Sequence, residues 1–163
     1  MQLFILDRNC RQAAEYLADI HLIKMCLETA QILSSVICMR NLVLPPEFPK
    51  PYNPHHPVIR AIQTPAQTAW VTTYNTALHR EYRFRFDKFH AYYPICGSYC
   101  DLLQTNGIEP ECLGLARVFN KFHTGINDIV DAHRAYYRHK MDILKHPPAW
   151  SRRPVPEVLK QIL

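Results

Sequence analysis

The stretch Arg11 to Met39, RQAAEYLADIHLIKMCLETAQILSSVICM, decides the fold. It contains neither glycine nor proline and consists largely of residues with good helix propensity, such as Ala, Leu, Met, Glu and Gln. We expect one long helix here, with Asn9 as its N-terminal cap. Apolar residues cover most of its circumference, which predicts a central place in the core.

A polar stripe interrupts this apolar helix. At about 3.6 residues per turn, one face carries four polar residues in succession: His21, Lys24, Glu28 and Gln31. Buried charges need partners, water or a cleft, so the stripe is either an exposed face with one Lys24–Glu28 pair or a site. In a site, Glu28 would accept a proton or stabilise positive charge on a ribose-like oxocarbenium ion. Lys24 would anchor a phosphate or act as an amine nucleophile.

The rest of the chain predicts further helices and no sheet, within one all-α domain over residues 1–163. The apolar run Met1–Leu6 is either a short strand or an extended segment. Six prolines make 41–57 a loop, and four more make 146–163 a basic, proline-rich tail. Thr64-Pro65-Ala66-Gln67 is a capping box that begins a second long helix toward Phe89. Other helices are expected at Tyr99–Thr105, Glu109–Arg117 and Ile126–Leu144.

Composition favours an intracellular domain with an anionic partner. Lys and Arg (19) outnumber Asp and Glu (14), which gives a net charge of +5 and favours a phosphate-bearing ligand, although many domains share this balance. None of the six cysteines forms a C-x-x-C pair, so we expect free thiols and a cytoplasmic protein. No signal peptide and no run approaching the about 20 apolar residues of a membrane span is evident, so no membrane partner is predicted.

Several basic segments are candidate phosphate contacts. His55, His56 and Arg60 lie in or beside the stiff proline-rich loop, where they either bind phosphate or are merely solvated. Adjacent histidines, even with Glu28 or His79, are a weak ligand pattern, so no metal is predicted. In the remaining groups, basic residues alternate with aromatic residues or come directly after them. Nucleic-acid-binding surfaces and ordinary amphipathic helices share this pattern. The groups are Arg80, Arg83, Arg85 and Lys88; Arg134, Arg138, His139, Lys140 and Lys145; and Arg152 with Arg153.

The segment Leu17-Ala18-Asp19-Ile20-His21-Leu22, with Glu28 seven residues after His21, resembles the phage pyrimidine-dimer DNA glycosylase (endonuclease V) family. A weaker likeness continues through His55-His56-Pro57 to Arg85-Phe86-Asp87 and reappears at Trp150–Pro154. The resemblance implies a compact helical fold, a phage origin, a DNA substrate and cleavage of an N-glycosidic bond through a Schiff base, without metal or other cofactor. It carries over His21 and Glu28 and, more loosely, Arg8.

The chain departs from that family where the nucleophile lies. The family uses the α-amine of an N-terminal threonine, but alignment on His21 and Glu28 places Asp7 there, and Gln2 disfavours removal of Met1. Leu27 and Gln31 replace arginines of the family. Asp7 is then a candidate carboxylate partner of Glu28 for hydrolysis.

Three functions follow from these observations. We expect an enzyme acting on DNA or a nucleotide; the alternatives are a phage protein that sequesters a signalling nucleotide and a protein-interaction module. The oligomeric state is left open. The expected catalytic residues are Glu28, His21, Lys24 and Asp7, and the expected phosphate-binding residues are Arg8, Gln31, His55, His56, Arg60 and Arg83.

Overall fold

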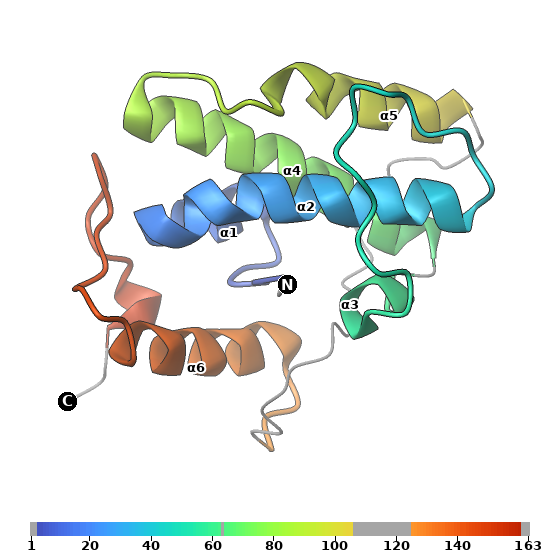
Figure 1. Ribbon diagram of the computed structural model, residues 1–163. Coiled ribbons are helices and arrows are strands. Elements are labelled where there is room, and N and C mark those ends of the chain that lie inside the picture. The colour runs from blue at the N-terminus through green and yellow to red at the C-terminus, as the bar shows by residue number, and fades with distance from the viewer. Residues whose placement is uncertain (1–2, 63, 106–124, 161–163) are drawn as a thin grey trace.

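The computed structural model describes residues 3–62, 64–105 and 125–160, and this part of the chain is all-α, as expected (Figure 1). It contains no strand. The helices are α1 (Cys10–Glu15), α2 (Asp19–Met39), α3 (Pro57–Arg60), α4 (Pro65–Phe86), α5 (Cys96–Thr105) and α6 (Ile129–Asp142), with short 3-10 turns at Tyr93–Ile95 and Glu157–Leu159.

The core forms around an antiparallel pair, α2 and α4. Asp19 at the start of α2 meets Arg85 near the end of α4, and Thr29 Oγ1 donates a hydrogen bond to Asn75 Oδ1 at 2.8 Å midway along the pair. In Figure 1, α5 lies above α2, α6 and α3 lie below it, and α4 passes behind it. The central helix is therefore covered on two sides, as its apolar circumference predicted.

Residues 3–6 are an extended segment packed in the core, not a strand. Leu3, Phe4, Ile5 and Leu6 are all buried, with exposures of 0–4%. The Ile5 N–H donates to His133 Nδ1 at 3.3 Å, so a side chain of α6 satisfies a backbone donor that a sheet would otherwise pair. The N-terminal segment is thus held between α2 and α6.

The helix expected over Arg11–Met39 is divided in two, so that prediction was wrong. Asn9 caps α1 as expected, but α1 ends at Glu15. Ala18 is extended (φ −66°, ψ 153°), and α2 begins at Asp19.

A continuous helix would have paired the backbone N–H and C=O groups at this break internally. Here, donors and acceptors from distant parts of the chain bind them instead. They come from α4 and the C-terminal tail, and so left no local signal in the sequence. The bonds are Arg85 to the carbonyls of Glu15 (2.8 Å) and Leu17 (2.7 Å), Trp150 Nε1 to the carbonyl of Tyr16 (3.0 Å), and the Asp19 N–H to the carbonyl of Ala149 (2.8 Å).

The other boundaries follow local signals closely. The capping box at Thr64 and Gln67 is present at the start of α4. That helix ends three residues before Phe89 because Asp87 adopts a left-handed conformation (φ 55°). Asp128 caps α6, which therefore starts later than the expected Ile126. The short helix α3 was not expected, and Glu109–Arg117 lies outside the described residues.

By length and composition α2 could cross a membrane, with a mean hydropathy of 1.5, contrary to the expectation that no stretch approaches a span. Neighbouring segments bury 61% of that window. A core helix of a soluble protein passes the same test.

Candidate functional site

The polar stripe of α2 borders the buried part of the helix. His21 is buried, Glu28 and Gln31 are half-buried, and Lys24 is exposed. The expected ion pair is present, with Lys24 Nζ 3.6 Å from Glu28 Oε1. The Glu28 side chain is only 13% exposed, whereas that of Lys24 is 69% exposed. The stripe therefore places a shielded carboxylate one helical turn from a solvent-facing ammonium group.

An aromatic junction closes the N-terminal end of the stripe. The Tyr137 hydroxyl of α6 lies 3.0 Å from His21 Nδ1 and accepts a hydrogen bond from the Ala18 N–H at 2.8 Å. The Phe4 ring packs against both, with centroids 5.4 Å from His21 and 4.8 Å from Tyr137. Phe4 is thereby fixed beside the same helix face that carries Glu28.

His21 is neutral near pH 7. Burial, with smaller effects from the charges of Lys140 and Lys24, lowers its pKa from 6.5 to about 4. Neutral imidazole can accept the Tyr137 hydroxyl hydrogen at Nδ1, because the hydroxyl oxygen is itself the acceptor for Ala18. His21 therefore orients the junction and adds no positive charge to the stripe.

The proline-rich loop is attached at the other end of the stripe. Ser35 Oγ donates to the Gln31 carbonyl at 2.7 Å and accepts a hydrogen bond from the Tyr52 N–H at 2.8 Å. The Tyr52 ring packs edge-on against His56, with centroids 5.3 Å apart. His56 caps α3, accepting from the Val58 N–H at 3.3 Å. The loop thus brings His56 to the α2 side of the molecule.

The remaining residues expected around the stripe lie in the two segments described above, the N-terminal segment and the proline-rich loop with α3. His55 and Arg60 are exposed, in the loop and on α3 respectively. Asp7 Oδ2 accepts from Arg134 of α6 at 3.1 Å, and its Oδ1 accepts from the Asn9 N–H at 2.9 Å. Arg8 is exposed and pairs with Asp128 at the start of α6. Asp7 and Arg8 therefore couple the chain start to α6.

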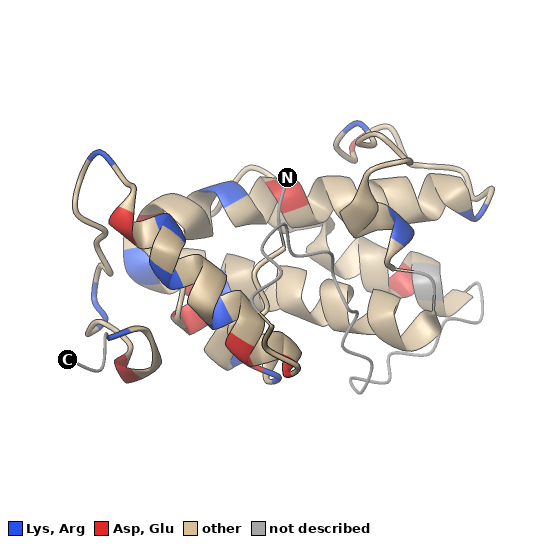
Figure 2. Cartoon of the chain, turned by 90° about the horizontal axis from the view of Figure 1, so that it is seen from below, with Lys and Arg blue, Asp and Glu red and all other residues tan. Residues whose placement is uncertain are grey.

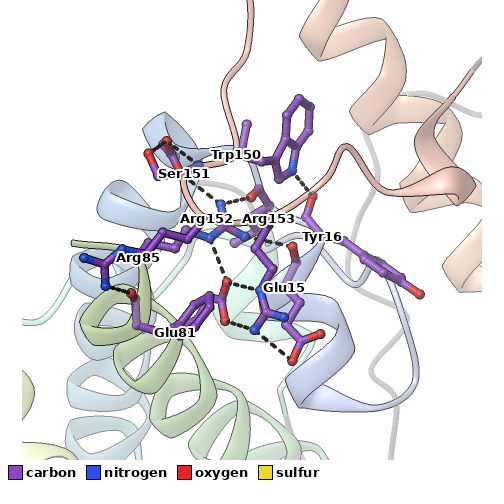
Figure 3. Close-up of polar contacts among 12 residues, drawn as sticks. Glu15, Tyr16, Glu81, Arg85, Trp150, Ser151, Arg152 and Arg153 are labelled. Carbon is purple, nitrogen blue, oxygen red and sulfur yellow. Dashed lines mark hydrogen bonds and ion pairs between the residues drawn. The ribbon is translucent and has the colours of Figure 1, made fainter. Parts of the chain in front are cut away.

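A buried ionic network explains why Asp19 stands in the motif. The Arg85 side chain is fully buried and donates to Asp19 Oδ1 at 2.9 Å and to Glu81 Oε1 at 2.7 Å (Figure 3). Arg153 of the tail binds the Glu81 carboxylate through two bonds of 2.9 and 2.8 Å. Ser151 Oγ donates to Asp19 Oδ2 at 2.6 Å. This network ties the tail to the start of α2.

The Glu81 carboxylate is ionised in this network. Burial acts to raise its pKa, but the hydrogen bonds from Arg153 and Arg85 outweigh that effect and hold the pKa below the ordinary value. The sequence grouped Arg85 with Arg80, Arg83 and Lys88 as candidate phosphate contacts. Because Arg85 is buried in the ionic network, it is a structural residue and unavailable for phosphate, so this prediction was wrong for Arg85.

Arg83 lies on a different face of the protein from the stripe. Its guanidinium stacks over the Phe89 ring, 4.6 Å from the centroid. It lines a cleft of about 430 Å³ at the end of α4, next to a larger one of about 680 Å³ between α1, α4 and the tail. Glu28 lines neither cleft. Arg83 is therefore separated from Glu28, whereas Arg8 lines the larger of these clefts.

The described cysteines, Cys10, Cys26, Cys38, Cys96 and Cys100, are free thiols, and Cys112 lies outside the described residues. Within residues 3–62, 64–105 and 125–160, no three His, Cys, Asp or Glu side chains gather closely enough to hold a metal ion.

Sequence reasoning missed the part of the site that α6 supplies. Val130, His133 and Tyr137 are all buried and are spaced by three and four residues, the signal of a helix face in the core. Figure 2, seen from the α6 side, shows basic residues along this helix. The sequence prediction for this segment rested on its basic residues, but the contact to the stripe comes from Tyr137 on the buried face of the helix.

A family model described as pyrimidine dimer DNA glycosylase matches residues 1–91, more than half of the chain. The match includes α1 to α4, and with them the whole stripe. No curated protein and no solved structure matches the chain.

Proposed function

Because the chain belongs to the pyrimidine dimer DNA glycosylase family, we propose that it cleaves the N-glycosidic bond of a damaged pyrimidine nucleotide in DNA, with Glu28 as the central carboxylate. We place this reaction at the stripe of His21, Lys24, Glu28 and Gln31, and in the cytoplasm, within a host cell if a phage encodes the protein. The stripe lies entirely within the residues that the family model matches.

One observation carries the assignment of Glu28. Its side chain is 13% exposed yet lies 3.6 Å from the ammonium group of Lys24. A shielded carboxylate beside a cleaved sugar stabilises a developing oxocarbenium ion more strongly than an exposed one, because less water screens its charge. Lys24, at the solvent side, is suited to hold the phosphate of the target nucleotide.

In the hydrolytic form of the reaction, a water oxygen attacks C1′ of the deoxyribose while the bond from C1′ to the base nitrogen breaks. Glu28 accepts a proton from that water, and the bonding electrons leave with the base, which is protonated from solvent. The product is a free base and an abasic site. Asp7 is already engaged by Arg134, so we assign it and Arg8 to positioning the chain start.

An amine route is the alternative form of the same activity. Here the nitrogen of Lys24 or of the N-terminal residue attacks C1′, the base leaves, and loss of a proton from nitrogen with ring opening produces an imine. Phe4 packs against His21 at the end of the stripe, which supports an amine of the N-terminal segment as the nucleophile. The two routes differ in whether the enzyme becomes covalently attached to DNA.

Phosphate contacts around the target are assigned to the proline-rich loop and α3. His56 is brought toward α2 by Tyr52, whose backbone N–H is bound to Ser35. Arg60 is exposed on the same short helix, and His55 precedes it in the loop. We propose that these residues and Gln31 bind the nucleotide beside Glu28.

The test uses the full chain and a panel of oligonucleotides with ultraviolet-damaged pyrimidines, and it measures released base and bound DNA separately. Glu28→Gln should lower base release at least about 100-fold and leave affinity nearly unchanged, since it removes charge but little volume. Glu47→Gln, an exposed carboxylate in the proline-rich loop, is the matched control and should have no effect.

Borohydride reduction separates the two routes, because it traps an imine on the protein and leaves a hydrolytic enzyme unlinked. No release of base from any damaged oligonucleotide by the parent chain would contradict the proposal. Tight binding of a free nucleotide without turnover would instead identify a sequestering protein.

A further inference from the structure

Two adjoining clefts cross the surface formed by α1, α4 and the C-terminal tail, away from Glu28. The larger, about 680 Å³, runs between α1 and α4 and reaches Arg153. The smaller, about 430 Å³, lies at the end of α4 and reaches Arg152. Arg80 and Phe84 line both, so the two clefts adjoin; together they are called here the arginine groove.

Cations predominate in the arginine groove. Its walls carry six arginines against three carboxylates, those of Glu15, Glu81 and Asp87. Glu15 and Glu81 are already bound by Arg153. The arginines are Arg8, Arg11, Arg80, Arg83, Arg152 and Arg153.

Arg80 occupies the junction of the two clefts and is the most available of these cations. It is exposed, and its guanidinium forms no ion pair or hydrogen bond with the rest of the described chain. Arg83, one turn further along α4, is exposed and held over Phe89 by a cation–π contact. Two arginines on one helix face are thus directed to solvent without a neutralising carboxylate.

Aromatic side chains accompany these arginines. Phe84 is 46% exposed in the groove, with Arg153 4.5 Å over its ring centroid. Phe89 is 53% exposed and packs on Tyr93, with centroids 4.5 Å apart. Exposed rings beside phosphate-binding arginines are suited to unpaired nucleotides, whose base faces are free to stack, and less suited to duplex DNA, whose bases are already stacked.

We propose that the arginine groove binds single-stranded DNA, with Arg80 and Arg83 contacting phosphates and Phe84 providing a stacking surface for a base. The groove lies outside the stripe and uses none of its residues, so the inference goes beyond the proposed glycosylase activity and does not depend on it. It assigns α4 a second role, after its role in the core.

The experiment measures binding of fluorescently labelled oligothymidylate to the full chain by anisotropy, over a series of salt concentrations. Arg80→Ala and Arg83→Ala should each weaken binding about fivefold, and each should lower the slope of log affinity against log salt by about 0.7. Lys50→Ala, which removes an exposed charge from the proline-rich loop, should change neither quantity.

Phe84→Leu tests the stacking contact and should weaken binding about fivefold without changing the salt slope. Circular dichroism and melting of each variant confirm that the fold is retained. Parent-level affinity and slope in the Arg80→Ala, Arg83→Ala double variant would overturn the proposal, and so would equal or tighter binding of a duplex of the same length.

Lys24→Ala, which removes the proposed phosphate contact at the stripe, separates this proposal from the proposed function. It should weaken binding of damaged DNA at the stripe but bind oligothymidylate as the parent does, whether or not the parent releases a base. Loss of oligothymidylate binding in Lys24→Ala would place the strand at the stripe and overturn the assignment to the groove.

Discussion

Replacement of Arg85 by lysine should destabilise the protein far more than its conservative chemistry suggests. The guanidinium presents donors in two directions, toward Glu81 on one side and toward Asp19 and the carbonyls of Glu15 and Leu17 on the other. A lysine ammonium is a single point with three donors and cannot span both groups. Some acceptors therefore lose their partner.

The magnitude follows from which acceptors have a second donor. Glu81 retains Arg153, and Asp19 retains Ser151, so the uncompensated groups are the carbonyls of Glu15 and Leu17 at the break between α1 and α2. A buried acceptor without a partner costs about 1–3 kcal/mol, which gives a total of about 3 kcal/mol for the two. For a domain of this size, that lowers Tm by roughly 6–12 °C.

Thermal unfolding followed by circular dichroism measures the effect, with Arg83→Lys as the matched control, because Arg83 is exposed on the same helix. The control should melt within about 1 °C of the parent. If Arg85→Lys also melted within about 2 °C of the parent, the buried network would not be what holds the divided helix, and the reasoning would be refuted.

Three further changes test other parts of the structure. Stability should fall on acidification: the pKa values of His21 and His79 are lowered from 6.5 to about 4, chiefly by burial, so the unfolded chain binds protons first. The contribution of the two neutral histidines to the free energy of unfolding is present above pH 6.5 and is lost toward pH 4. At about pH 5 the loss is about 2 kcal/mol per histidine. Urea unfolding at a series of pH values measures it. Thr64→Ala removes the capping box of α4 and should cost about 1 kcal/mol in the same assay; Thr64→Asn, which restores a cap, should cost much less. Tyr137→Phe leaves the Ala18 N–H without its acceptor and should cost about 1–3 kcal/mol, and an unchanged midpoint would argue against the junction.

Much of the helical architecture was predictable because helix signals are local. Asn9 accepts from N–H groups two and three residues ahead, and the Thr64–Gln67 box spans three residues. The Lys24–Glu28 pair was equally predictable, because residues four apart on a helix face each other whatever surrounds them. Their roles in chemistry remain predictions that the Glu28→Gln experiment tests.

The burial of Arg85 was not predictable from its neighbours. In the sequence it belongs to the series Arg80, Arg83, Arg85 and Lys88, and all four look like surface cations. The helical periodicity of α4 places Arg85 on the face toward α2, where it pairs with Asp19. Arg80 and Arg83 lie on the solvent-exposed face. Only the packing of α4 against α2 distinguishes a structural arginine from one available to a ligand.

The sequence alone determined that the chain is helical, where its long helices lie and which face of α2 is polar, because those properties depend on residues within a few positions of one another. The tertiary structure decided that the first helix divides before Asp19, that Tyr137 closes the stripe and that the tail binds Glu81. The partners in those interactions lie up to 134 residues apart, as Trp150 and Tyr16 do. Their hydrogen bonds exist only once folding has brought the segments together, because each group alone would be satisfied by water.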